Sequence, residues 1–222
     1  MHDTPPLKGK NTLLGAVRSP ARLLRVFTLI SLVSFVGIIT LAGAGLYFIY
    51  RGHIIDDAEE NAVRIGRAIF DQEQRFLLAA DRDGRQTIGV SPQAFLPLDG
   101  RMRSYLRPLN IMKVKFFDRT RKIVYSTDHS LIGKIDGDNT ALVLALQGSV
   151  VSKIVKKGAM LDLAGEKRYD VDVVETYFPI IDGNQEPIGA FEIYVDVSQA
   201  FGHIMRVSFL SLAILSAVML AA

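Results

Sequence analysis

The sequence predicts an α+β fold in which a long helix lies on a five-stranded antiparallel sheet, with a membrane-spanning helix on each side of the domain. Three observations lead to this prediction. Uncharged apolar segments lie near both ends of the 222 residues, at 26–50 and 207–222. A helical pattern without proline follows the first segment. Strand-like segments then alternate with polar turns and one short helix. A helix and a sheet of this kind bury their apolar faces by packing as two layers.

The first membrane helix is predicted at Val26–Tyr50, a stretch of 25 residues without a charge. At about 1.5 Å per residue it exceeds the roughly 30 Å hydrocarbon core of a bilayer. A small-residue site at 42–44 is similar to a signal-peptide cleavage site, but the apolar run continues to Tyr50, which favours an uncleaved anchor. The 16 uncharged residues of 207–222 are interpreted as a second membrane helix cut by the end of the sequence, in preference to a buried helix of a soluble core.

Charge is distributed unevenly along the chain. Residues 1–25 carry five basic side chains and one acidic side chain, whereas residues 51–206 carry 21 basic and 22 acidic side chains. The net charge of +3 therefore comes from the tail, and no nucleic-acid surface is expected. By the positive-inside rule, we expect 1–25 to be a cytoplasmic tail, 26–50 and 207–222 to be membrane helices, and 51–206 to be one extracytoplasmic domain.

Composition and motifs argue against catalysis. The absence of cysteine removes thiol nucleophiles, thiolate metal sites and disulfides. The four histidines are scattered along the sequence, so no metal centre is expected. The sequence has no phosphate-binding glycine loop and no nucleophile elbow. We therefore expect no catalytic residues, no cofactor and no enzyme activity in this chain.

The domain is expected to begin with a helix from His53 to about Ala80, where good helix formers are frequent. Apolar or small residues recur there in steps of three and four, with one glutamine among them. The positions are Ile55, Ala58, Ala62, Ile65, Ile69, Gln72 and Phe76. Such a stripe either packs on the domain's own sheet or, in addition, contacts a second copy of the helix in a dimer.

The remaining elements follow in order from local patterns. A proline-containing loop is expected at 87–100, and Ser198 is expected to be the N-cap of the last helix. Alternating apolar residues and polar turns predict the strands, and a run ending at Gly148 predicts a helix. The expected ranges are a short helix at 101–107, a hairpin of 112–117 and 122–126, a helix at 137–147, and strands at 149–157, 168–180 and 188–197.

Three segments of the domain resemble a known family. They are FFDRTRKIVYSTDHSLIGK (Phe116–Lys134), ALVLALQGSVVSKI (Ala141–Ile154) and VETYFPIIDGNQEPIGAFEIYVDVS (Val174–Ser198). In their order, spacing and position between membrane helices they resemble the PAS-like extracytoplasmic sensor domains called single-Cache or PDC domains, over about residues 55–200. The resemblance implies a ligand-sensing input module. A small molecule would bind beside the sheet, and the change would pass through the last strand and second membrane helix to a cytoplasmic output domain. That output would be a histidine kinase, a diguanylate cyclase, a phosphodiesterase or a chemotaxis signalling domain.

The chain departs from two ligand patterns of that family. Relatives that sense citrate and dicarboxylates have an Arg and a His in the strand before the IGK turn, where this chain has Ile123 and Ser126. The pattern for amino acids in double-Cache domains needs a Trp, which this chain lacks. Neither ligand class is therefore indicated.

Candidate ligand-binding residues lie at strand ends and on the strand after the short helix. Tyrosine and serine offer hydroxyl groups, and lysines form charge-assisted hydrogen bonds with an anionic ligand. The candidates are Tyr125, Ser126, Asp128, Lys153, Lys156, Tyr177 and Tyr194, with Lys157 beside Lys156. The alternatives are tyrosines at the edge of the core with their hydroxyl groups in water, solvent-exposed lysines, and Asp128 as a turn residue.

The resemblance and the predicted topology place the chain in the bacterial inner membrane as a multi-pass protein with a periplasmic sensor domain. The expected partners are a small-molecule ligand, the membrane and a second copy in a homodimer. Small residues at Gly37, Thr40 and Ala44 lie on one face of the first membrane helix and would allow close approach of another helix. The alternative is a ligand-free, membrane-anchored dimerisation or protein-docking module, and a more distant third is a membrane-tethered periplasmic enzyme.

Overall fold

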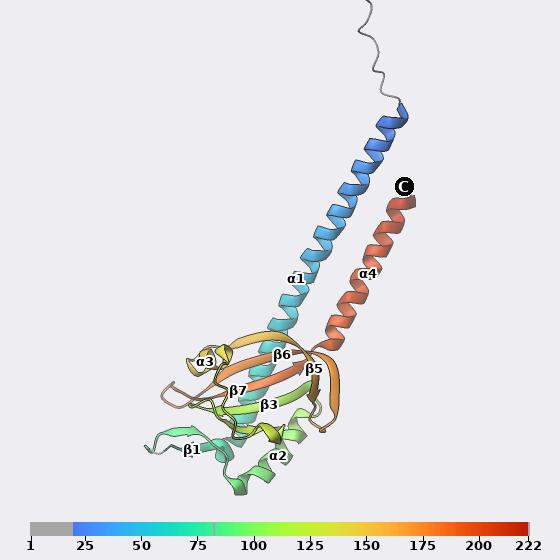
Figure 1. Cartoon of the computed structure of the whole chain (residues 1–222). Coiled ribbons are helices and arrows are strands. Elements are labelled where there is room, and N and C mark those ends of the chain that lie inside the picture. Colours follow the sequence, from blue (N-terminus) through green and yellow to red (C-terminus); the bar gives the residue numbers. More distant parts are fainter. Residues whose placement is uncertain (1–19, 82, 222) are drawn as a thin grey trace, which may run out of the picture. The chain divides into compact units, whose positions relative to one another are not determined.

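A computed structural model describes residues 20–81 and 83–221, and the side chains of 215 and 218–221 are outside the description (Figure 1). Most of the expected tail, 1–25, lies outside the described residues. The chain divides into two compact units, with the boundary after Leu46 inside the first helix, α1 (Pro20–Leu77).

The first described unit consists of the N-terminal part of α1, whose large apolar side chains are exposed. Among the described residues, α1 is long and apolar enough to cross a membrane, and its most apolar window is not buried. The span predicted at 26–50 lies within this helix. The second predicted span, 207–222, falls largely in α4 (Ser198–Ala221), and its membrane role stays a prediction.

The second unit contains the five-stranded antiparallel sheet that the sequence predicts. The strands are hydrogen-bonded in the order β4-β3-β7-β6-β5, so β7, the last strand in the sequence, lies at the centre of the sheet. Their bounds are β3 (Ile111–Asp118), β4 (Ile123–Ser126), β5 (Val151–Leu161), β6 (Lys167–Ile181) and β7 (Pro187–Asp196).

The C-terminal part of α1 packs on one face of the sheet, called here the α1 face (Figure 1). Its buried residues are Ala58, Ala62, Gly66, Ile69, Glu73 and Leu77. This confirms that the stripe covers the domain's own sheet, while the dimer alternative stays a prediction. A Cβ at Gly66 would overlap the ring of Phe178, so only glycine lets the helix approach this closely.

The prediction of a loop at 87–100 is wrong, because α2 (Pro92–Leu106) occupies most of this range. Pro92 lies in the first turn, where a missing N–H costs nothing, and the Ser91 hydroxyl accepts a hydrogen bond from the backbone N–H of Ala94. Burial of Leu98, Met102 and Leu106 against the α1 face compensates for Pro97 inside the helix. The helix therefore forms because these apolar contacts stabilise it, although its prolines favour a loop.

Smaller differences concern element ends. The helix expected to reach Ala80 ends at Leu77, and its last residues form a hairpin of β1 (Leu78–Ala80) with β2 (Gln86–Ile88). The third helix, α3 (Thr140–Leu146), is shorter than expected because Asn139 caps it. Ser198 begins α4, but its hydroxyl accepts from the backbone N–H of Asp172 on β6.

The opposite face of the sheet, called here the α3 face, is covered at one end by α3. Ala141, Leu142 and Ala145 of this helix pack against Phe117 and Tyr177 of the sheet. Beyond α3 the side chains on this face are mainly charged, and they form the candidate site.

Candidate functional site

Strand alternation places a charged set of residues on the α3 face. Antiparallel register sets Lys115 opposite Glu192, and Glu192 opposite Tyr177 on the next strand. The same alternation adds further members from all four of the longer strands. The set, called here the polar face, is Lys113 and Lys115 on β3, Lys153 and Lys157 on β5, Glu175 and Tyr177 on β6, and Glu192 and Tyr194 on β7.

A buried ion pair lies at the centre of the polar face. Lys115 Nζ is 2.9 Å from Glu192 Oε2 and donates a 2.8 Å hydrogen bond to the Tyr194 hydroxyl. The Glu192 side chain has no exposed surface. Burial, together with the negative charge of Glu192, raises the pKa of Tyr194, so its hydroxyl stays protonated. Lys115 therefore links Glu192 and Tyr194 at the centre of the polar face.

Glu175 binds two lysines of the edge strand. Its carboxylate lies 3.1 Å from Lys153 Nζ and 2.6 Å from Lys157 Nζ, and it accepts a hydrogen bond from the Tyr177 hydroxyl. Burial acts to raise the pKa of Glu175, but the hydrogen bonds and charges of Lys157 and Lys153 outweigh it and hold that pKa below its ordinary value. Asn139, at the start of α3, donates to the same Tyr177 hydroxyl.

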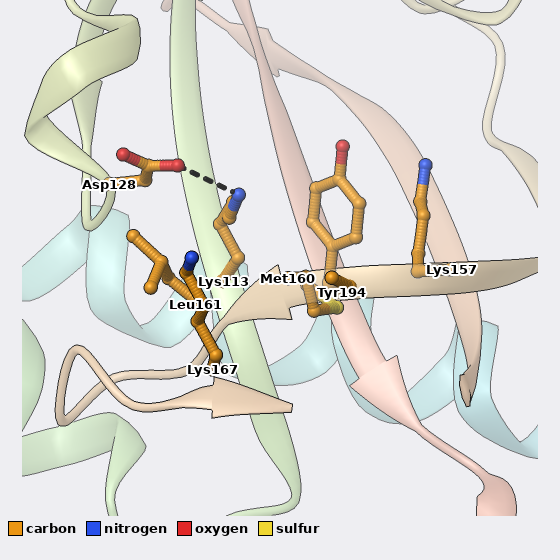
Figure 2. Close-up of a pocket in the computed structure, with 8 residues that line it drawn as sticks. Lys113, Asp128, Lys157, Met160, Leu161, Lys167 and Tyr194 are labelled. Carbon is orange, nitrogen blue, oxygen red and sulfur yellow. Dashed lines mark hydrogen bonds and ion pairs between the residues drawn. The ribbon is translucent and has the colours of Figure 1, made fainter. Parts of the chain in front are cut away.

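A pocket of about 360 Å³ opens beside this network (Figure 2). Figure 2 shows the Tyr194 hydroxyl and the Lys157 ammonium pointing in the same direction, with Lys113 joined to Asp128. The lining residues are Lys113, Asp128, Lys157, Ala159, Met160, Leu161, Lys167 and Tyr194. Three ammonium groups and one carboxylate give this lining an excess of positive charge.

Asp128 is fixed at the pocket by several contacts. Its Oδ2 lies 3.1 Å from Lys113 Nζ, and its Oδ1 accepts a 2.7 Å hydrogen bond from the Ser130 hydroxyl. Its backbone N–H donates to the Ser126 hydroxyl. Burial acts to raise the pKa of Asp128, but the hydrogen bonds from Ser130 and Lys113 outweigh it and lower that pKa. Asp128 is therefore negative at neutral pH.

The structure brings some of the predicted site residues together and separates others. Asp128 and Tyr194 line the pocket. Lys153 and Tyr177 lie on the polar face beside it, and Ser126 is buried opposite Lys115. Tyr125 and Lys156 do not join them. Each is one residue away in its strand from a residue on the α3 face, so strand alternation places it on the opposite face of the sheet. Their ligand-binding role receives no support from this placement.

Tyr125 belongs instead to a second polar cluster, between the sheet and α2. Its hydroxyl donates a 3.0 Å hydrogen bond to Asp99, which also pairs with His129 at 3.0 Å and with Arg103 at 2.9 Å. Arg103 further donates to the backbone carbonyls of Thr127 and Leu163. This cluster connects α2 with Thr127, which precedes Asp128, and with Leu163 in the turn between β5 and β6.

Sequence reasoning missed Lys113, Lys115, Lys167, Glu175 and Glu192. The alternation in Lys113-Val114-Lys115 and in Glu192-Ile193-Tyr194 indicates one charged face, and it could have identified three of these residues. Among the described residues, no group of three or more His, Asp or Glu side chains is arranged to hold a metal ion.

Comparisons with known proteins find the fold but no sequence family. Neither protein-family models nor curated proteins match this chain. Among solved structures, the periplasmic domain of RsbU from Chlamydia trachomatis is 13% identical, with a TM-score of 0.50 over 80% of this chain and 59% of that one. The sensor domain of the V. cholerae histidine kinase DctB is 11% identical, with a TM-score of 0.44 over 74% of this chain and 58% of that one. The E. coli DcuS sensor domain is 13% identical, with a TM-score of 0.41 over 68% of this chain and 96% of that one.

The chain thus spans less than two thirds of the RsbU and DctB structures that it matches. The likeness to RsbU, together with the long helix and the five-stranded antiparallel sheet, confirms the expected PAS-like, single-Cache fold. The fold is thus of the kind found in the periplasmic domain of RsbU.

Proposed function

We propose that this chain is the ligand-sensing input region of a membrane-bound signal-transduction receptor, and that its ligand is a small organic anion. The observation that carries the proposal is the pocket on the α3 face, where Lys113, Lys157 and Lys167 surround a space of about 360 Å³. A volume of this size lies within the range of small-molecule binding pockets.

The chemistry of the lining supports an anionic ligand. Ammonium groups bind carboxylate or phosphate oxygens through charge-assisted hydrogen bonds, and the Tyr194 hydroxyl supplies a further polar contact. Met160 and Leu161 give the pocket an apolar wall, which suits a short hydrocarbon skeleton. Because an arginine fork is absent from this lining, the pocket suits an anion bound by separate point charges.

The proposed signal path runs from the pocket to α4. Tyr194 lines the pocket on β7, and Asp196, two residues later, accepts a hydrogen bond from the backbone N–H of Ser198, where α4 begins. Binding that favours one position of β7 would therefore bias α4, and a small shift suffices when a helix has two packing arrangements. We propose that α1 and α4 cross the inner membrane, that the domain is periplasmic, and that the receptor is a homodimer. Its output would be a histidine kinase, a diguanylate cyclase, a phosphodiesterase or a chemotaxis domain.

The test is a binding measurement on the full 222-residue chain in detergent. The probes are succinate and inorganic phosphate, with putrescine and glycerol as cationic and neutral comparisons. Thermal unfolding followed by circular dichroism detects any ligand that binds only the native state, because such a ligand raises the melting temperature. We expect dose-dependent stabilisation by an anion and none by putrescine or glycerol.

Two lysine variants test whether the anion binds in this pocket. Lys113→Met removes an ammonium group from the pocket, and we expect it to abolish the stabilisation. Lys134→Met is the matched control, because Lys134 is exposed and lies outside the pocket lining. Equal stabilisation of Lys113→Met and the unmodified chain would overturn the pocket assignment. No response to any anion would favour the docking-module alternative.

A further inference from the structure

The pocket already contains a carboxylate of its own. Asp128 Oδ2 contacts Lys113 Nζ at 3.1 Å, and only 13% of the Asp128 side chain and 11% of the Lys113 side chain are exposed. This is the same ammonium-to-carboxylate contact that an anionic ligand would make. A ligand that binds Lys113 must therefore share or replace the Asp128 contact.

Two further hydrogen bonds hold Asp128 in place beside Lys113. The Ser130 hydroxyl donates to its other oxygen at 2.7 Å, and the Ser126 hydroxyl accepts from its backbone N–H at 3.0 Å. A group oriented in this way loses little freedom when it pairs with Lys113, which makes it an effective competitor. Asp128 directly precedes a short 3-10 helix, His129–Leu131.

The other ammonium groups of the pocket differ in their partners. Lys157 pairs with Glu175, which is almost fully buried and part of the central network. Lys167, at the start of β6, is exposed and has no ion-pair partner among the described residues. Lys113 is therefore the pocket cation whose partner lies on a loop segment and can be displaced without opening the core.

We propose that Asp128 is an internal competitor that sets the affinity and selectivity of the pocket. It occupies Lys113 in the unliganded domain, so that only an anion able to replace its carboxylate binds. Release of Asp128 then removes the side-chain contact between this loop and β3, while Ser126 and Thr127 stay paired with β3 through their backbone. This inference rests on the proposed function, because it assumes that the pocket binds an anion.

The test compares Asp128→Asn with the unmodified full-length chain in detergent, by isothermal titration with succinate and with inorganic phosphate. Loss of the competing charge should tighten anion binding about tenfold, the scale of one hydrogen bond to a charged group. Asp138→Asn is the matched control. It removes one negative charge from an exposed position outside this pocket, and it should change the affinity by less than about twofold because solvent and salt screen it.

Each outcome decides a different point. Tighter binding by Asp128→Asn alone supports the inference, as does binding by this variant when the unmodified chain shows none. Equal or weaker binding by Asp128→Asn, with binding by the unmodified chain, overturns the competitor role and leaves the sensor proposal intact. No binding of either probe by either protein overturns both. If Asp128→Asn unfolds, Asp128→Ser, which also removes the charge, decides the same question.

Discussion

The two faces of the sheet are made by alternate residues of the same strands, yet their chemistry differs. On the α1 face the rings of Phe116 and Phe191 stack with their centres 4.0 Å apart. On the α3 face, one residue along each strand, Lys115 pairs with Glu192. Apolar contacts stabilise almost any close packing, whereas buried charges stabilise only the one arrangement that pairs them. The comparison indicates that the α1 face supplies most of the stability and that the α3 face supplies a defined electrostatic geometry.

The largest expected effect is on the α1 face. Phe191→Ala removes a fully buried ring that contacts Phe116 and Phe178 and lies close to Gly66. We expect the free energy of unfolding to fall by about 3–5 kcal/mol, the usual cost of truncating a buried aromatic residue. Urea denaturation of the detergent-solubilised chain measures this value. A loss below about 1 kcal/mol would mean that this face is not the main source of stability.

The next prediction concerns the buried pair on the α3 face. Lys115→Met leaves the Glu192 carboxylate buried without its cation, and we expect a loss of about 3 kcal/mol. The double change Lys115→Met with Glu192→Leu removes both charges, and it should recover most of this loss. Urea denaturation of the two proteins tests this pattern. A double variant as unstable as the single one would show that the pair contributes more than mutual neutralisation.

A smaller effect is expected at the second polar cluster. Tyr125→Phe removes the hydroxyl that donates to Asp99 but keeps the buried ring. The free energy of unfolding should fall by about 1–2 kcal/mol, because Asp99 loses one of its buried partners. Succinate affinity should stay unchanged, because Tyr125 lies on the face opposite the pocket. A loss of succinate affinity without a loss of stability would contradict this prediction and indicate that Tyr125 takes part in ligand binding.

The smallest effect is a pH dependence of the same cluster. Burial acts to raise the pKa of Asp99, but hydrogen bonds from Arg103, His129 and Tyr125 outweigh it and hold the pKa below its ordinary value of 3.8. A lowered pKa contributes stability that is fully present above the unfolded value and is lost as the pH falls through the folded value. The difference in stability between the unmodified chain and Asp99→Asn should therefore shrink from pH 7 towards pH 3. A constant difference would exclude this linkage.

Sequence reasoning predicted the five strands because alternation and polar turns are local signals. The strand expected at 168–180 is observed at Lys167–Ile181, and the one expected at 188–197 is observed at Pro187–Asp196. Sequence reasoning missed α2, because Pro92 and Pro97 indicate a loop unless the burial of Leu98 is known. It also missed β1 and β2, whose three residues each are too short to show a period.

The site was harder to predict than the fold. Whether Lys156 or Lys157 faces the pocket depends on which side of β5 meets α3, a relation between segments far apart in sequence. The same reason separates Tyr125 from Ser126. Lys113 and Asp128 are 15 residues apart and meet only because β3 and β4 pair as a hairpin. A pattern read along one strand cannot supply such contacts.

The position of β5 has a consequence for handling this protein. It is an 11-residue strand at the edge of the sheet, a length that invites another chain to pair with it. Lys153, Lys156 and Lys157 place charge along that edge, which disfavours association between sheets. Neutralising these lysines together would therefore promote aggregation during expression and refolding. Lysines of the pocket are best replaced one at a time, with the oligomeric state followed by size-exclusion chromatography.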